Sequence, residues 1–291
     1  MSKIRAIKRR IKSAKSIEQI TRGMMMVATA KYRRAQQRAL KARPYFDALK
    51  TILELHSDEG DFTHPMLSHG DPSRIGIIVV TADKGLCGSF NTNLVRSVVN
   101  FIRANPDKTF ELMCVGKKGY DFFHRRQYTI HAHFHGLFQK LTFASSESVT
   151  ASIYEFFIHR NLGACYIASN RFVSAMAYRP LIAQALPVPR NVLGPHGVDA
   201  KFANAYLYEP SPEELLSFLL PQYLKQLTWQ TLMESEAAEH LARMAAMNMA
   251  TKSTQEMIAS LTILYNRGRQ AGITSELADI VGGAEALQSA H

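Results

Sequence analysis

Apolar residues recur at spacings of three and four along both ends of the chain, the pattern of helices that pair as a coiled coil. The N-terminal stripe consists of Ile4, Ile7, Ile11, Ala14, Ile17, Ile20, Met24, Val27 and Ala35. The C-terminal stripe consists of Ala237, Leu241, Met244, Met247, Thr251, Ile258, Leu261 and Tyr265. Because a single helix is marginal in water without a partner, we expect the two segments to pair, antiparallel.

The prolines divide the chain into three parts, because all eleven lie between Pro44 and Pro221. Proline removes a helical hydrogen bond and clashes with the preceding turn, so the long helices are expected in the proline-free ends. We predict a coiled-coil helix within residues 1–58, an α/β domain at 74–190 and a second coiled-coil helix at 211–287.

The middle of the chain alternates between strand and helix patterns. Strands are expected at 74–81, 109–115 and 128–134, helices at 91–104, 118–126 and 146–160, and two further strands within 164–188. This order predicts a small, mostly parallel, helix-covered sheet of Rossmann-like type. The fold class is therefore α/β, with a long antiparallel coiled coil added to the sheet domain.

No segment approaches the roughly 20 uncharged apolar residues that span a bilayer, so any membrane association is expected to be peripheral. Three cysteines, Cys87, Cys114 and Cys165, are too far apart in sequence for a disulfide framework or a zinc knuckle. This cysteine usage is typical of a reducing compartment.

The positive charge is concentrated at the N-terminus. Residues 1–43 hold fourteen Lys and Arg and one acid, residues 44–210 hold sixteen and fourteen, and residues 211–291 hold five and nine. Such a segment can bind nucleic acid, an anionic membrane or an acidic protein, and it also resembles a transit peptide. No aromatic residue precedes Tyr32 to stack on bases, and the apolar stripe continues far beyond any cleavage site. An acidic protein partner is favoured, and a basic nucleic-acid-binding scaffold is the alternative.

The turn TADKGLCGSFN, residues 81–91, follows the first predicted strand and opens a helix. Doubly wound folds bind phosphates there, but the glycine spacing matches neither GxGxxG nor GxxxxGK(S/T). No local signature pairs Cys87 with a histidine, so a buried or contact-forming thiol is favoured over a nucleophile. The turn therefore predicts no cofactor and no catalytic centre.

Three histidines, His131, His133 and His135, alternate along a predicted strand, so their rings are expected on one face. Three imidazoles can hold zinc, but nothing nearby completes a site. A solvated or partner-facing strand is the favoured interpretation, and no metal is predicted.

Five segments, in order and over nearly the full length, resemble the gamma subunit of F-type ATP synthase. They are ITRGMMMVATAKYRRAQ (20–36), TADKGLCGSFN (81–91), YLYEP (206–210), ESEAAEHLARMAAMNMAT (234–251) and LYNRGRQAGITSELADIVGGAEAL (264–287). In that family the paired terminal helices form a central stalk inside a ring of alpha and beta subunits, and nucleotide chemistry belongs to beta. The resemblance implies a non-catalytic rotor that couples ion flow to ATP synthesis or hydrolysis.

The resemblance also implies which residues meet which partner. Arg269 and Gln270 match positions that engage a catch loop of beta, with Thr274 and Glu276 just beyond. The stretch facing an acidic lever segment of beta contains Thr21, Arg22, Met24, Met25, Met26, Lys84 and Cys87. The foot that touches the membrane c ring contains Tyr206, Tyr208 and Glu209. Coiled-coil or bearing packing is expected of Leu261, Ile273, Leu277 and Ile280.

The implied partners are the alpha, beta and epsilon subunits and the c ring, with one copy of this chain per complex and no nucleic acid. The implied location is the cytoplasmic face of a bacterial inner membrane, as a peripheral membrane protein. The sequence leaves open whether the coupling ion is H⁺ or Na⁺, the size of the c ring, and whether the enzyme mainly makes or consumes ATP.

Overall fold

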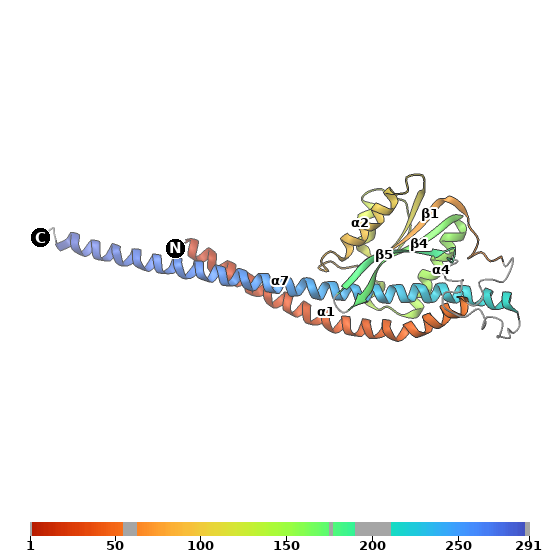
Figure 1. Cartoon of the computed structure of the whole chain (residues 1–291). Coiled ribbons are helices and arrows are strands. Elements are labelled where there is room, and N and C mark those ends of the chain that lie inside the picture. The colour runs from red at the N-terminus through yellow and green to blue at the C-terminus, as the bar shows by residue number, and fades with distance from the viewer. Residues whose placement is uncertain (1, 55–62, 175–176, 190–210, 289–291) are drawn as a thin grey trace. The chain divides into compact units, whose positions relative to one another are not determined.

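The computed structural model describes residues 2–54, 63–174, 177–189 and 211–288. In chain order the elements are α1 (Ser2–Glu54), β1 (Asp71–Val80), α2 (Phe90–Arg103), β2 (Thr109–Val115), α3 (Lys117–His124), β3 (Ile130–Phe134), the 3₁₀ turn η1 (Leu137–Gln139), α4 (Phe143–His159), β4 (Leu162–Ser174), β5 (Ala177–Leu186) and α7 (Pro212–Gln288) (Figure 1). The predicted order of strands and helices is confirmed, with ends shifted by a few residues.

The five strands of the described region form one sheet in the order β3-β2-β1-β4-β5. Strand β1 pairs in parallel with β2 and β4, β2 pairs in parallel with β3, and β5 runs antiparallel to β4. The end of β1, from Ile75 to Val80, is buried throughout, as expected of a strand covered on both faces. The mostly parallel, helix-covered sheet is confirmed.

Packing divides the chain into two compact units: Ala28–Arg243, and Met1–Val27 together with Met244–His291. In the first unit, α2 and α3 cover one face of the sheet. The other face packs against α4 and also against parts of both long helices, including Leu49 and Leu53 of α1 and Leu220 and Leu232 of α7. The core of the larger unit contains residues from all three predicted parts, 1–58, 74–190 and 211–287. Their division into separate domains therefore stays a prediction.

Both long helices extend beyond the proline-free ends of the chain, since Pro44 lies inside α1 and Pro221 inside α7. A proline within a helix costs about 3 kcal/mol. Fully burying a large apolar side chain contributes about 1.5–3 kcal/mol, and Leu53, beyond Pro44, and Leu224, beyond Pro221, are almost completely buried. Packing on the sheet therefore outweighs the local penalty in both helices.

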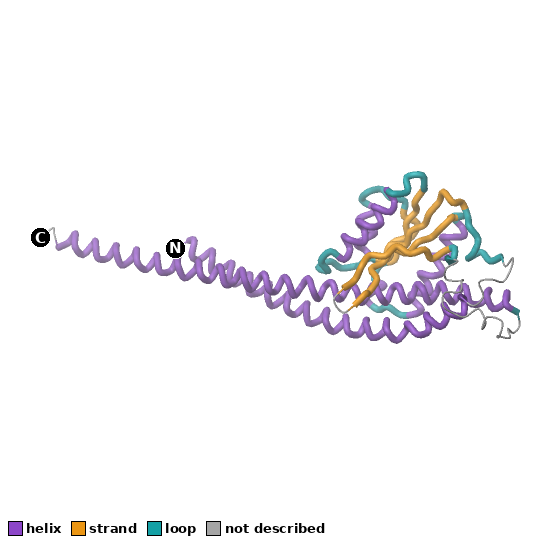
Figure 2. The backbone as a smooth tube through the Cα atoms, in the orientation of Figure 1, coloured by secondary structure: helices purple, strands orange, loops and turns teal. Residues whose placement is uncertain are grey.

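In the second unit, α1 and α7 lie side by side and antiparallel, and α7 continues past the start of α1 (Figure 2). The predicted antiparallel pairing is confirmed, but the predicted N-terminal stripe is wrong at three positions, Ile17, Ile20 and Val27, whereas Ala35 is buried and Met24 half-buried. Ile17, Ile20 and Val27 are 49%, 61% and 58% exposed. The less exposed positions include an unbroken three-four alternation: Ile4, Ile7, Ile11, Ala14, Glu18, Thr21 and Met25.

Candidate functional site

The turn between β1 and α2 is held by hydrogen bonds to its own side chains. The two carboxylate oxygens of Asp83 accept hydrogen bonds from the backbone N–H groups of Lys117 and Gly136, each with an N···O distance of 3.0 Å. Asn91 accepts the Ala82 N–H at 2.9 Å. Because the Asp83 carboxylate already occupies the N-terminus of α3, a phosphate there would be repelled. The geometry of the turn gives nucleotide binding no support.

The cysteines lie in the core of the larger unit. Cys87 is 2% exposed and packs with Ala238 and Ala242 of α7. Burial raises the pKa of the Cys87 and Cys165 thiols, and it raises the pKa of Cys114 to about 12. Thiols that stay protonated and shielded from solvent are poor nucleophiles.

The expectation that the three histidines of β3 share a face is wrong. The pairing of β2 with β3 shifts between Leu112 and Met113, which leaves His131 as an extra residue. The His131 ring therefore stacks on Phe156 of α4, whereas His133 stacks on Tyr120 of α3. Across the described part of the chain, no group of three or more His, Cys, Asp or Glu is arranged to hold a metal.

A buried charge network, which sequence reasoning missed, ties this turn to α7. Arg243 donates to Glu239 Oε1 at 2.7 Å and to the carbonyl oxygen of Gly85 at 3.3 Å. On the same helix, Glu236 pairs with Arg38 of α1 at 2.6 Å. The spacing of Glu239 and Arg243, four apart in an apolar helix, was the available signal.

The network perturbs its own titrating groups. Burial, with added repulsion from Arg243, Lys31 and Arg38, lowers the pKa of His240 to about 4. Burial raises the pKa of Glu236 and Glu239, although Arg38 and Arg243 oppose that shift. The Arg38–Glu236 pair joins α1 to α7, and Arg243 joins α7 to the turn at Gly85.

The predicted lever-facing residues divide into exposed and buried ones. Arg22, Met26 and Lys84 are exposed, and Met24 and Met25 are half-buried. Thr21 is buried and bonded to Thr251, and Cys87 is buried in the core, so neither side chain is at the surface as predicted. Thr21 is buried because it lies between α1 and α7, and Cys87 is buried because it packs against α7.

The last turns of α7 present the other predicted contacts. Arg269, Gln270, Thr274 and Glu276 are all exposed, and the Thr274 hydroxyl donates to the Gln270 carbonyl oxygen at 3.0 Å. Gly268 and Gly272 lie beside Ile4, the first residue of α1 whose burial is described. Beyond them α7 exposes a stripe of large apolar side chains: Ile273, Leu277, Ile280 and Val281.

The predicted contact with the c ring and the predicted peripheral membrane association concern different parts of the chain. The predicted foot residues Tyr206, Tyr208 and Glu209 lie outside the described residues. Within the described chain, no helix combines the length and the apolarity that crossing a bilayer requires.

Comparison with known proteins gives consistent matches. Residues 3–287 match the family described as ATP synthase. The chain is 40% identical over 292 residues to the ATP synthase gamma chain of Heliobacterium modesticaldum, covering 99% of this chain and 100% of that one. It is 39% identical over 295 residues to the ATP synthase gamma chain of Chlorobium phaeobacteroides, with the same coverage.

Solved structures share the fold. A chain of the Euglena gracilis mitochondrial ATP synthase, from a structure of OSCP, F1 and c-ring, matches with a TM-score of 0.68 at 18% identity, covering 99% of this chain and 95% of that one. A chain of the Tetrahymena thermophila central stalk and c-ring matches with a TM-score of 0.61 at 23% identity, covering 79% and 99%.

Proposed function

Because this chain belongs to the ATP synthase gamma-chain family, we propose that it is the central-stalk rotor of an F-type ATP synthase, itself without catalytic activity. The observation that carries this proposal is the antiparallel pair of α1 and α7, from which α7 alone continues with an exposed apolar stripe. An extended helix with exposed apolar residues needs a partner around it. The alpha and beta subunits supply a ring for this role. Neither the family match nor the relatives support the nucleic-acid-binding alternative.

In this proposal the exposed face of α1 meets an acidic segment of beta. Every Lys and Arg from Arg5 to Arg22 is exposed, whereas the acid Glu18 accepts a hydrogen bond from Gln255 of α7 at 2.7 Å. The surface contact residues are Arg22, Met26 and Lys84, with Met24 and Met25 partly available. Thr21 and Cys87 support these positions from within.

Near its end, α7 is proposed to engage a catch loop of beta through Arg269, Gln270, Thr274 and Glu276. A guanidinium suits a carboxylate partner because its planar fork can donate two parallel hydrogen bonds. Tyr206, Tyr208 and Glu209 are proposed to contact the c ring. The complex would contain one copy of this chain with epsilon, peripheral to a bacterial inner membrane on its cytoplasmic face, and would couple H⁺ or Na⁺ flow to ATP turnover.

The decisive experiment replaces Arg269 with alanine in the assembled enzyme. Losing one member of a charge-assisted pair weakens a contact by about tenfold or more. We expect ATP-driven ion pumping in membrane vesicles to fall by about this factor. Nucleotide affinity of isolated beta should not change, since beta itself is unaltered.

The matched control is Arg267→Ala, which removes another exposed guanidinium from the same helix two residues away. It should pump at the rate of the unsubstituted enzyme. The contact with beta is refuted if both variants pump normally or if both lose activity equally. Purification of the complex separately tests the subunit assignment, because alpha, beta and epsilon should accompany this chain.

A further inference from the structure

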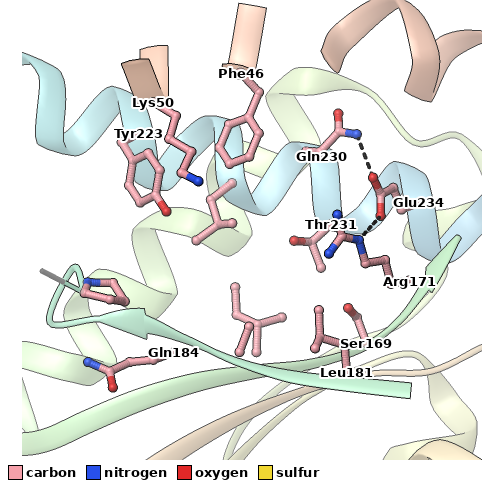
Figure 3. A pocket seen from close by; sticks show the side chains of 14 residues that line it. Phe46, Lys50, Ser169, Arg171, Leu181, Gln184, Tyr223, Gln230, Thr231 and Glu234 are labelled. Atoms are coloured by element: carbon pink, nitrogen blue, oxygen red, sulfur yellow. Dashed lines mark hydrogen bonds and ion pairs between the residues drawn. The ribbon is translucent and has the colours of Figure 1, made fainter. Parts of the chain in front are cut away.

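Two pockets in the larger compact unit differ in how their charges are balanced. In the pocket drawn in Figure 3, Glu234 accepts a hydrogen bond from Gln230 and lies 4.0 Å from Arg171. Arg43 donates a further hydrogen bond to this carboxylate at 3.2 Å, so the acid of that pocket is already neutralised. The second pocket, of ≈ 530 Å³, lies between α1, residues 138–141 and α7, and we call it the basic pocket.

Five cations line the basic pocket: Lys31, Arg34, Arg38, Lys41 and Lys140. The first four follow one another at spacings of three, four and three residues, so they form a row along one face of α1. The fifth belongs to the segment after η1, which forms a second wall. Glu236 of α7 is the carboxylate in the described lining. An excess of four positive charges therefore surrounds one small space.

Most of these cations have no counter-charge. Glu236 pairs with Arg38 at 2.6 Å, and Arg38 also donates to the carbonyl oxygen of Leu141 at 3.4 Å. Among the residues that the structure describes, the other four cations of the pocket form no ion pair. All four are exposed. Their charge is therefore available to an anion that enters the pocket.

Both walls of the basic pocket are anchored in the core. On α1, Ala35 and Ala39 lie between the cations of the row and are 1% and 2% exposed. On the second wall, Leu141 is buried at 5% exposure, and the Gly136 N–H at the start of the segment donates to Asp83 at 3.0 Å. The two backbones are therefore held in place without a ligand, which lowers the entropy cost of binding one.

His240 of α7 already responds to this charge. It lines the basic pocket and is 7% exposed. Burial lowers its pKa to about 4, and repulsion from Arg243, Lys31 and Arg38 adds to the shift. Because a group beside unbalanced cations resists becoming a cation itself, the shift indicates a positive potential on the α7 side of the pocket. An anion bound in the pocket would lower that potential.

Several unpaired cations around one space favour a ligand with several negative charges close together. A terminal phosphate carries about two negative charges at neutral pH, more than a single carboxylate. The fork of Arg34 can bind two phosphate oxygens at once, and a lysine ammonium binds phosphate as a point charge. The pocket volume is typical of small-molecule sites. A short chain of phosphates combines this charge density with this size.

We propose that the basic pocket binds a linear chain of three phosphate groups, either as free tripolyphosphate or as the triphosphate of a nucleotide. The chain lies along the row from Lys31 to Lys41 and meets Lys140 on the second wall. None of the residues that line this pocket is among those proposed to contact beta or the c ring. The inference therefore goes beyond the rotor assignment and does not depend on it.

The test measures binding of tripolyphosphate and of orthophosphate to the full chain by isothermal titration calorimetry. Salt at about 0.15 M screens exposed charges that lie far from the ligand. We expect saturable binding of tripolyphosphate, and at least about tenfold weaker binding of orthophosphate, which has fewer charges to set against the row. Because the cations from Arg5 to Arg22 are exposed and also attract anions, the decisive quantity is the difference between variants.

Two double variants locate the binding. Arg34→Gln with Lys140→Gln removes one cation from each wall and should weaken tripolyphosphate binding at least about tenfold. Arg33→Gln with Lys117→Gln is the matched control, because it removes the same charge from exposed positions outside the pocket. The control should bind as the unsubstituted chain does. Circular dichroism establishes that each variant is folded.

A nearly isosteric change gives an independent measurement. Gln139 lines the pocket and is exposed, so Gln139→Glu adds a negative charge there with little effect on packing. It should weaken tripolyphosphate binding about tenfold. Gln127→Glu, at an exposed position outside the pocket, is its control and should leave the affinity unchanged. If the double variant does not fold, this pair of single variants decides.

ATP without a metal ion distinguishes the two sources of the phosphate chain. Affinity equal to or above that of tripolyphosphate, lost in the same pocket variants, assigns the pocket to nucleotides. Much weaker binding of ATP assigns it to free polyphosphate. Both results support a site for a phosphate chain.

The proposal is overturned if tripolyphosphate does not bind saturably, or if the pocket variants and their controls bind it equally. It is also overturned if a peptide of six glutamates binds more tightly than tripolyphosphate and loses affinity in the pocket variants, because the pocket would then recognise an acidic protein segment. All of these measurements use the chain without other subunits, so failure of the rotor assignment would not change their result.

Discussion

His240 lies in α7 at 7% exposure, among charged groups of α1 and α7. Arg243 donates toward its Nδ1 at 3.3 Å, which leaves the ring proton on Nε2. The other charges that shift the network are Arg38 and Lys31 of α1 and the carboxylates Glu236 and Glu239 of α7. Protonating His240 would add a cation beside three others in a buried site.

This environment predicts a loss of stability in acid. The pKa of His240 falls from 6.5 to about 4 on folding, so between these pH values the unfolded chain binds more protons and acid favours unfolding. Between pH 6.5 and 4.5, the unfolding free energy of the His240→Gln chain should therefore decrease by about 2 kcal/mol less than that of the unsubstituted chain. Chemical denaturation across this range measures it.

Glu236 and Glu239 act in the opposite direction, because their raised pKa values favour protonation of the folded chain as pH falls. Comparing the variant with the unsubstituted chain largely cancels their contribution. His159→Gln, at an exposed position of α4, is the matched control and should leave the pH profile unchanged. Parallel profiles for His240→Gln and the unsubstituted chain would contradict a neutral buried imidazole.

At the scale of elements, the seam between α1 and α7 contains a polar layer. The Thr251 hydroxyl donates to Thr21 Oγ1 at 2.8 Å, and Gln255 bonds Glu18 one turn away. Apolar layers are interchangeable between registers, whereas paired polar groups match in one register only. We expect this layer to fix how the two helices align.

Changing both Thr21 and Thr251 to valine tests this role. Stability should change by less than about 1 kcal/mol, because both hydroxyls are replaced by methyl groups of the same shape. Alignment should become less specific. In the threonine background, oxidation should join Ile4→Cys to Gly268→Cys, since a Cβ at Gly268 lies 3.4 Å from Ile4.

In the valine background, Ile4→Cys should also join Ser275→Cys, one heptad further along α7. Mass spectrometry of peptides after oxidation counts each cross-link. Equal cross-linking patterns in the two backgrounds would show that the apolar layers alone set the register.

This polar layer also explains where prediction from sequence failed. Hydrophobicity assigned Ile17 and Ile20 to the seam, but the pairing of Thr21 with Thr251 keeps the strict alternation and turns both isoleucines outward. The hydrophobicity of one segment does not tell which residues of the partner helix lie opposite it. The long helices, the order of strands and the exposed Arg269 were all readable, because each depends on local pattern or motif.

Features set by contacts far apart in sequence could not be read from local pattern. Pro44 stays helical because Leu49 and Leu53 pack on the sheet, and His131 turns away from His133 because β3 carries an extra residue against β2.

At the scale of the whole molecule, some of the N-terminal basic residues form ion pairs with α7 and others are exposed. Arg38 and Arg43 pair with Glu236 and Glu234 inside the larger unit, at 2.6 and 3.2 Å. The cations of α1 from Arg5 to Arg22 are exposed, and the acid among them is Glu18. Lys31, Arg33, Arg34 and Lys41 are exposed as well, so exposed cations continue along α1 beyond Arg22.

If α1 and α7 rotate as one body, a covalent bond between them should leave the motor working. Thr21→Cys and Thr251→Cys place two sulfur atoms where hydroxyl oxygens now lie 2.8 Å apart, close enough for a disulfide. We expect ATP hydrolysis and ATP-driven ion pumping by the assembled complex to be within about twofold of the reduced enzyme after oxidation.

The natural cysteines interfere little with this experiment, because Cys87, Cys114 and Cys165 are each 2% exposed or less. Oxidation of a complex without the new cysteines is the control, and gel mobility under non-reducing conditions reports the cross-link. An activity that disappears on oxidation and returns with reductant would mean that the helices slide or unwind during each turnover. An unchanged activity would mean that turnover needs no relative motion of α1 and α7 at that layer, because the bond forbids such motion there.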